Sequence, residues 1–220
     1  MTVLAKICGI NSFSAAQAAI DHGAGFLGFI YFPKSPRHLG VDAARSLMEQ
    51  AKQHAFTHQL RVKRVSVVVN PDNELLDHIH RELQPDFIQL HGHETPERVA
   101  DIRARLNVPL IKAITVSSKD DVAAARAYEP LVAHMLFDAK PPADAGLPAG
   151  VGAKFDWTLM EGHKGSAPWF LAGGLDPWNV ADAVATAKAP MVDVSSGVER
   201  GPGLKDASLI SNFLKAVKGI

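Results

Sequence analysis

Short apolar, β-branched runs alternate with segments of helical period along almost all of this 220-residue chain. The runs expected to be strands are residues 3–8, 26–31, 64–69, 87–90, 110–114, 134–137, 169–172 and 191–194. Helical apolar spacing marks residues 14–22, 42–53, 73–83, 96–106, 119–127, 177–187 and 207–217. A chain that alternates strands with helices pairs its strands in parallel through right-handed crossovers. Eight such units predict an α/β fold, a closed (β/α)8 TIM barrel, with residues 1–220 as a single domain.

The sixth unit departs from this regularity. A Gly-, Ala- and Pro-rich stretch over residues 139–155 predicts a long loop, and only a short helical pattern follows at residues 156–161. A doubly wound open sheet is the rival architecture, but it usually has fewer strands and an N-terminal glycine fingerprint. The sequence therefore favours the barrel. Side chains suited to helix N-termini precede or open several predicted helices: Asp42, Asp72, Thr95 and Asp176.

The charge balance restricts the kinds of partner. Lys and Arg number 23, as do Asp and Glu, whereas nucleic acids and anionic membrane surfaces attract proteins with a basic excess. A single cysteine excludes an internal disulfide framework and fits a reducing compartment. No run approaches the roughly 18 apolar residues that cross a bilayer, and the N-terminus lacks a secretory-signal pattern. We therefore expect a cytoplasmic protein that acts on a small molecule, not on nucleic acid or membrane.

In a (β/α)8 barrel, functional residues lie where strands end and the following loops begin. Cys8 ends the first predicted strand, and Lys6 lies on the same face of that strand. Cys8 is either a small buried apolar residue or, where the Lys6 ammonium favours its thiolate, a general base. Asp138 follows the sixth strand and is a candidate acid. An acid and a base on opposite sides of one bound molecule suffice for an isomerisation.

Glycine-rich turns follow the last two predicted strands. Gly173 and Gly174 come after the seventh, and Ser196 and Gly197 come after the eighth. Loops at these positions of a barrel often bind phosphate, because glycine lets the backbone approach and its N–H groups point at the anion. The alternative is that the paired glycines only make a tight turn into the next helix. The phosphate interpretation is the stronger, because adjacent positions both carry glycine.

Ten histidines raise the question of a metal site. His78 and His80 are two residues apart on a predicted helix and cannot share a face. His91 and His93 flank a glycine after the fourth strand, but no carboxylate or cysteine accompanies them at a zinc-site spacing. We therefore expect no metal, and expect His91 to pack beside a substrate or to order its loop. Asp193, on the last strand, is expected either to bond a neighbouring loop or to touch substrate.

Seven ordered motifs make the chain similar to the phosphoribosylanthranilate isomerase family. They are Lys6-Ile7-Cys8-Gly9, Ser35-Pro36-Arg37, Gln89-Leu90-His91-Gly92, Phe137-Asp138, Phe155-Asp156-Trp157, Leu171-Ala172-Gly173-Gly174-Leu175 and Val192-Asp193-Val194-Ser195-Ser196-Gly197-Val198-Glu199. Each motif alone is modest, but their joint order from the first strand to the last is highly specific.

The resemblance implies a cofactor-free barrel enzyme of tryptophan biosynthesis, a monomer or homodimer. The family converts N-(5-phosphoribosyl)anthranilate into 1-(2-carboxyphenylamino)-1-deoxyribulose 5-phosphate by an Amadori rearrangement. It implies that Asp138 is the general acid, that Cys8 is the general base and that Arg37 pairs with the anthranilate carboxylate. Lys6 and His91 are further candidates for the substrate site. The phosphate would lie on Gly173, Gly174, Ser196 and Gly197.

One departure from the family pattern concerns a loop. The family usually has Gly-Gly-Thr-Gly where this chain has Ala149-Gly150-Val151-Gly152, so a hydroxyl is lost.

Two other functions are alternatives to this isomerase. Another phosphate-binding barrel of the pathway, an indole-glycerol-phosphate synthase or a tryptophan synthase α-like lyase, would show Lys/Glu or paired-carboxylate patterns at strand ends. A non-catalytic phosphate-binding barrel would need the glycine turns but neither the acid nor the base.

Overall fold

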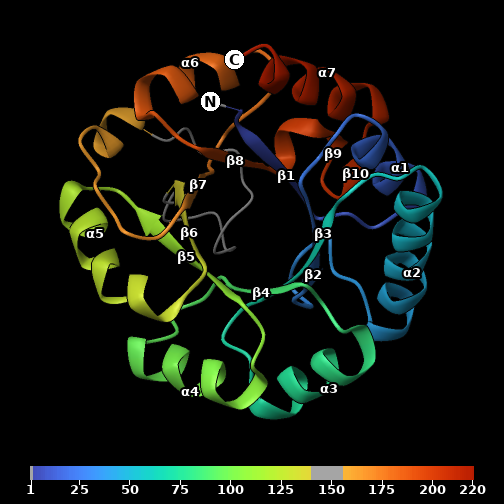
Figure 1. The fold of residues 1–220 in the computed structure, drawn as a ribbon, viewed down its shortest axis with the longest axis horizontal. Coiled ribbons are helices and arrows are strands. Elements are labelled where there is room, and N and C mark those ends of the chain that lie inside the picture. The colour runs from blue at the N-terminus through green and yellow to red at the C-terminus, as the bar shows by residue number, and fades with distance from the viewer. Residues whose placement is uncertain (1, 140–155) are drawn as a thin grey trace.

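The computed structural model describes residues 2–139 and 156–220. Its barrel consists of β1 (Leu4–Cys8), β2 (Phe26–Tyr31), β3 (Lys63–Val68), β4 (Phe87–Leu90), β5 (Leu110–Val116), β6 (His134–Ala139), β7 (Trp169–Leu171) and β8 (Met191–Val194). Each strand pairs in parallel with the next, and β8 pairs with β1 to close the ring (Figure 1). The predicted (β/α)8 TIM barrel is confirmed.

A ring of helices surrounds the strands (Figure 1). The helices are α1 (Phe13–Asp21), α2 (Val41–Thr57), α3 (Asn73–Leu83), α4 (Pro96–Leu106), α5 (Lys119–Ala124), α6 (Val180–Ala187) and α7 (Ala207–Lys218). The bounds of α3 and α4 match the prediction, because Asp72 and Thr95 cap their N-termini with side-chain oxygens that accept backbone N–H groups.

The structure differs from the prediction at two helix N-termini for which a capping side chain was expected, and α1 begins one residue earlier than predicted. Helix α2 begins at Val41, so Asp42 lies in its first turn and Gly40 is the capping residue. Helix α6 begins at Val180 instead of residue 177. The Asp176 carboxylate accepts backbone N–H groups of the two residues before α6, and this closes a separate turn ahead of the helix.

The sixth unit is irregular, as predicted, and its described helical element is a 3₁₀ helix, η3 (Trp157–Met160), where residues 156–161 showed a helical pattern. In the fifth unit, α5 ends at Ala124, before the predicted residue 127, and two 3₁₀ helices, η1 (Ala125–Ala127) and η2 (Glu129–Leu131), follow it before β6. The expected loop over residues 139–155 and its Ala149–Gly152 departure lie outside the described residues, apart from Ala139. After β8, a 3₁₀ turn η4 (Ser196–Val198) leads into an unpredicted antiparallel hairpin of β9 (Glu199–Gly201) and β10 (Leu204–Lys205).

Apolar side chains fill the barrel interior at the end where the strands begin. His134, at the start of β6, lies among the rings of Phe26, Phe87 and Phe170, with ring centroids 5.2–5.9 Å apart. Burial lowers the pKa of His134. Side chains fill this end of the barrel, so the predicted polar site residues lie at the opposite end.

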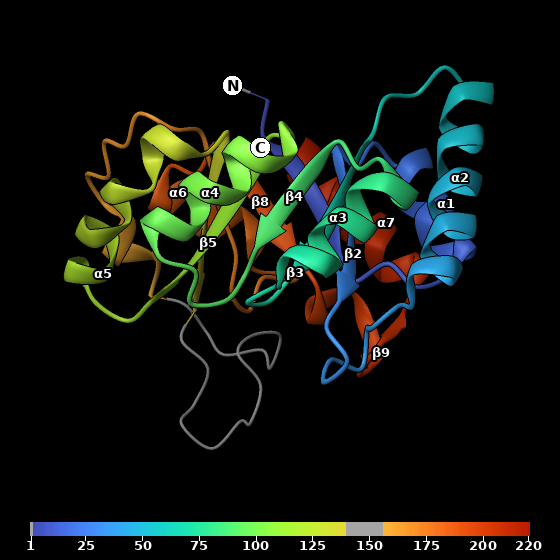
Figure 2. The same ribbon diagram turned by 90° about the horizontal axis from the view of Figure 1, so that it is seen from below.

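The strand carboxyl ends define that opposite end. In the side view of Figure 2, β9 lies at the lower edge of the barrel and the C-terminus lies at the upper edge. The strands run toward the edge that carries β9. Among the described residues, no helix is long and apolar enough to cross a membrane.

Candidate active site

Cys8 lies at the carboxyl end of β1, beside a buried ion pair. Lys6, on the same strand, donates to Asp193 Oδ1 of β8 at 2.9 Å, and the two residues are register partners. Both are buried, with side-chain exposures of 0% and 7%. Gly28 of β2 makes room for the pair of β1 side chains, since a Cβ there would lie 2.9 Å from Cys8 Sγ and 3.1 Å from Lys6 Nζ. The backbone thus holds the thiol and the ammonium together in the barrel.

The charges around Cys8 act in opposite directions. Burial raises the pKa of the Cys8 thiol, and the Lys6 ammonium lowers it by less, so the pKa lies above its ordinary value. Burial lowers the pKa of Lys6, but Asp193 and Cys8 together outweigh burial and keep that pKa above its usual value. The expected influence of Lys6 on Cys8 is therefore present, but it does not produce a low-pKa thiol.

Asp138 and His91 face each other from β6 and from the loop after β4, on one side of the mouth. Asp138 lies near the end of β6, and its Oδ2 is 3.3 Å from Nε2 of His91, which directly follows β4. Gln89 Nε2 donates to His91 Nδ1 at 2.8 Å. Because Nδ1 then accepts, the proton of a neutral imidazole lies on Nε2, facing the carboxylate. Around the ring, β7 and β8 separate Asp138 from Cys8 on that side.

A second buried ion pair fixes the loop that carries His91. Lys112 of β5 donates to Glu94 Oε2 at 2.9 Å and to the backbone carbonyl oxygen of Gly92 at 2.9 Å. Glu94 in turn accepts the backbone N–H of Asn70 and of Gly92. Burial raises the pKa of Glu94, but Lys112 and these donors outweigh it and leave the pKa below its usual value. The β4 loop is thus held rigidly next to Asp138.

Arg37 comes from the loop after β2 and meets the β9 hairpin. Its Nε and Nη2 donate to Oε1 and Oε2 of Glu199, both at 2.7 Å. Lys205 of β10 also donates to Glu199, at 2.6 Å, and to the Ser195 carbonyl at 2.9 Å. The structure therefore places Arg37 at the mouth in a two-point ion pair with a carboxylate.

The two glycine turns lie against each other. Gly173 and Gly174 have φ of +87° and +68°, in the left-handed region that favours glycine. A Cβ at Gly197 would lie 1.9 Å from the carbonyl oxygen of Leu175, so the β8 turn approaches the β7 loop as closely as a glycine allows. Ser196 begins η4 in the same turn. All four residues predicted to bind phosphate thus come together at one place on the rim.

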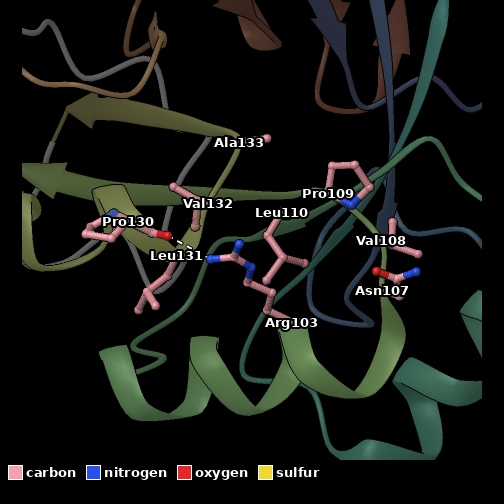
Figure 3. Close-up of a pocket in the computed structure, with 9 residues that line it drawn as sticks. All are labelled: Arg103, Asn107, Val108, Pro109, Leu110, Pro130, Leu131, Val132 and Ala133. Carbon is pink, nitrogen blue, oxygen red and sulfur yellow. Dashed lines mark hydrogen bonds between the residues drawn. The ribbon is translucent and has the colours of Figure 1, made fainter.

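A separate pocket of about 310 Å³ lies at the other end of the barrel. Figure 3 shows its lining, in which Arg103 of α4 donates to the carbonyl of Pro130. Leu110, the first residue of β5, and Ala133, which precedes β6, lie beside them. This pocket contains none of the predicted site residues. Within residues 2–139 and 156–220, no three His, Cys, Asp or Glu side chains gather as a metal-binding group.

The predicted residues divide into two groups around the mouth. Cys8, Lys6, Arg37 and the glycine turns lie on the side formed by β7, β8, β1 and β2, and Asp138 lies with His91 on the β4–β6 side. Sequence reasoning gave no role to Gln89, Glu94, Lys112, Glu199 or Lys205. The available signal for Lys112 was a charged residue inside an otherwise apolar strand. The pairing of Lys6 with Asp193 follows from the register of β1 and β8, which only the structure shows.

The chain is similar to known proteins over nearly its whole length. Residues 5–216 match a family model described as N-(5'phosphoribosyl)anthranilate (PRA) isomerase. The chain is 52% identical over 218 residues to the N-(5'-phosphoribosyl)anthranilate isomerase of Caulobacter sp. (strain K31), covering 99% of this chain and 100% of that protein. The corresponding protein of Paramagnetospirillum magneticum is 45% identical, covering 100% and 99%.

Solved structures show the same similarity. The phosphoribosyl anthranilate isomerase of Thermotoga maritima superposes with a TM-score of 0.82 at 33% identity, covering 99% of this chain and 100% of that chain. Another isomerase structure, in complex with reduced 1-(o-carboxyphenylamino)-1-deoxyribulose 5-phosphate, gives a TM-score of 0.80 at 32% identity, with the same coverage. The family match, the full-length relatives and the barrel confirm the resemblance seen in the motifs: the chain is an isomerase and belongs to the N-(5'-phosphoribosyl)anthranilate isomerase family.

Proposed function

We propose that this chain converts N-(5'-phosphoribosyl)anthranilate into 1-(2-carboxyphenylamino)-1-deoxyribulose 5-phosphate, an Amadori rearrangement in tryptophan biosynthesis. The observation that carries the proposal is the placement of Cys8 and Asp138 on separate sides of one mouth, with the glycine turns of β7 and β8 on the same rim. An acid and a base held apart over one ligand suit an aldose–ketose isomerisation. The reduced product bound to a relative supports the same ligand class.

The acid half of the reaction is assigned to Asp138. Its protonated carboxyl gives a proton to the furanose ring oxygen while the bond between that oxygen and C1′ breaks. The nitrogen lone pair forms a C1′=N double bond, so the product of this step is a cationic Schiff base. His91 Nε2, 3.3 Å from Oδ2, can donate to the Asp138 carboxylate that remains.

The base half is assigned to Cys8. Its thiolate removes the C2′ proton, the C2′–H electrons form a C1′=C2′ bond, and the C1′=N electrons return to nitrogen, which gives a neutral enolamine. A proton then adds to C1′ as the enol hydroxyl loses its proton, and the ketone results. Because burial raises the pKa of the Cys8 thiol, the thiolate fraction at neutral pH is small and the rate should increase with pH.

Two binding contacts orient the substrate. The Arg37 guanidinium is suited to the planar anthranilate carboxylate, and the backbone of Gly173, Gly174, Ser196 and Gly197 is suited to the phosphate. Lys6 supports Cys8 through the ion pair with Asp193 and does not itself need to touch the substrate. The proposed reaction needs no cofactor, nucleic acid or membrane. We propose that the enzyme is cytoplasmic. A relative is described as dimeric, so a monomer or homodimer is proposed.

The test follows the fluorescence of phosphoribosylanthranilate as it is consumed. Cys8→Ala and Asp138→Asn should each lower kcat by orders of magnitude while circular dichroism shows an intact barrel. The residual rate of Cys8→Ala should lose the increase with pH that the wild type shows. Near-normal turnover in both variants would refute the acid–base assignment, and a folded protein that binds product without turning over substrate would favour a non-catalytic barrel.

A further inference from the structure

A buried cluster at the mouth joins the loop after β2 to the β9–β10 hairpin, two segments that are far apart in the sequence. Arg37 comes from the loop after β2, Glu199 from β9 and Lys205 from β10. The side-chain exposures are 5%, 3% and 0%, respectively. We propose that Glu199 is the positioning residue that sets the plane of the Arg37 guanidinium for the substrate carboxylate, and that Lys205 holds Glu199 in place. This inference rests on the proposed function, since it deepens the role given there to Arg37.

Every bond to the Glu199 carboxylate restricts its orientation. Oε1 accepts from Arg37 Nε at 2.7 Å and from Lys205 Nζ at 2.6 Å, and Oε2 accepts from Arg37 Nη2 at 2.7 Å and from Gly203 N at 3.2 Å. A guanidinium is planar and rigid, so bonds at Nε and Nη2 fix both its direction and its plane. A carboxylate with donors on both oxygens is therefore a fixed support rather than a mobile partner.

The stem of Arg37 is confined as closely as its head group. A Cβ at Gly9, where φ is +78°, would lie 2.5 Å from Arg37 Cδ, so the arginine passes directly over the loop after β1. The carbonyl of Pro36 packs on Gly203, where a Cβ would lie 2.5 Å from that oxygen. Asn11 donates to the Gly203 carbonyl at 2.8 Å. Loops from three strands therefore converge on Arg37, and Glu199 supplies the polar end of this clamp.

The charges of the three side chains favour one bound anion. Arg37 and Lys205 are cations and Glu199 is an anion, so the trio carries one net positive charge away from bulk water. Burial raises the pKa of Glu199, but its bonds with Arg37 and Lys205 outweigh burial and hold that pKa below its usual value, so the carboxylate stays charged. A substrate carboxylate is attracted to these two cations, whereas a plain hydrophobic ring is not.

The test compares Glu199→Gln with the wild type for two ligands. One is the reduced product analogue, which carries the 2-carboxyphenyl group, and the other is the same molecule with an unsubstituted phenyl group. Titration calorimetry should show that Glu199→Gln weakens the carboxylate ligand roughly tenfold and the phenyl ligand less than about twofold. In steady-state assays KM should increase while kcat changes much less, because the contact exists before the chemistry.

Two further variants keep the test decisive. Glu199→Asp keeps the charge but shortens the reach, and it should show a smaller loss that is again confined to the carboxylate ligand. Asp86→Asn disrupts the hydrogen bonds that Arg64 donates to the Asp86 carboxylate, at the end of the barrel where the strands begin. This variant should leave the affinities for both ligands unchanged. If Glu199→Gln and Glu199→Asp weaken both ligands equally, or neither, then Glu199 is a structural brace and the inference is wrong.

Arg37→Lys separates this failure from a failure of the proposed function. If Arg37→Lys loses the preference for the carboxylate ligand and Glu199→Gln retains it, only the positioning role is refuted. If Arg37→Lys also retains the preference, the assignment of Arg37 to the substrate carboxylate is wrong, and the positioning role is wrong with it.

Discussion

The buried pair of Lys112 and Glu94 allows a quantitative prediction of stability. Lys112→Met removes the ammonium but keeps most of the apolar volume of the side chain. Both side chains of the pair are only 2% exposed, so the Glu94 carboxylate would remain buried without its cation. Breaking a buried pair by removing one partner costs about 3–5 kcal/mol.

The contacts around the pair narrow that range. Glu94 keeps the backbone N–H groups of Asn70 and Gly92, which favours the lower end. Against this, the carbonyls of Gly92 and Ala113 lose the donor that now lies 2.9 and 2.8 Å away. We expect a loss of about 3–4 kcal/mol, which is a large share of the 5–15 kcal/mol typical of a folded domain.

Urea unfolding followed by circular dichroism measures this loss. Lys52→Met is the matched control, because Lys52 pairs with Glu49 on the surface at exposures of 59% and 64%, and exposed pairs contribute about 0–1 kcal/mol. The double variant Lys112→Met/Glu94→Gln should be less destabilised than the sum of its single variants, by about 0.5–3 kcal/mol. If Lys112→Met costs no more than Lys52→Met, the reasoning about the buried Lys112–Glu94 pair is refuted.

Three further outcomes follow from the structure. Gly197→Ala should raise KM roughly tenfold by forcing apart the two glycine turns, whereas Gly40→Ala, which has open space around it, should leave KM unchanged in the same fluorescence assay. Asp193→Asn should cost about 3–5 kcal/mol in urea unfolding, because it leaves the Lys6 ammonium buried without its anion. Burial lowers the pKa of His134, so the unfolded chain binds the proton more readily and stability should fall as pH decreases below about 6.5; His134→Phe should reduce that dependence in pH-resolved thermal melts.

The strands were predictable because their signal is local. A buried parallel strand reads as a short apolar run, and the rule that loops follow the carboxyl ends then places Cys8 and Asp138 on one rim. The predicted N-terminus of α6 was wrong for a local reason as well. Asp176 can cap a turn as easily as a helix, and here it closes a turn before Val180. Propensity does not separate these two uses of the same carboxylate.

The partners of the charged residues could not be predicted in the same way. Arg37 and Glu199 are 162 positions apart, and only the closure of the barrel brings the loop after β2 against the hairpin after β8. The hairpin itself has two short strands, too few residues for a periodic signal. Lys205 gave no signal either, because a lysine in such a hairpin is ordinarily a solvated surface residue.

The arrangement of these partners explains how one mouth can hold the proposed acid and the proposed base at once. Cys8 belongs to a network with Lys6 and Asp193 on β1 and β8, whereas Asp138 contacts His91, which the β4 loop supports. The two networks share no hydrogen bond among the described residues. A change of charge on one side therefore reaches the other without a shared hydrogen bond, through the space of the mouth. Separate environments are what allow two titratable groups to keep different protonation states, and here the strand order of the barrel supplies that separation.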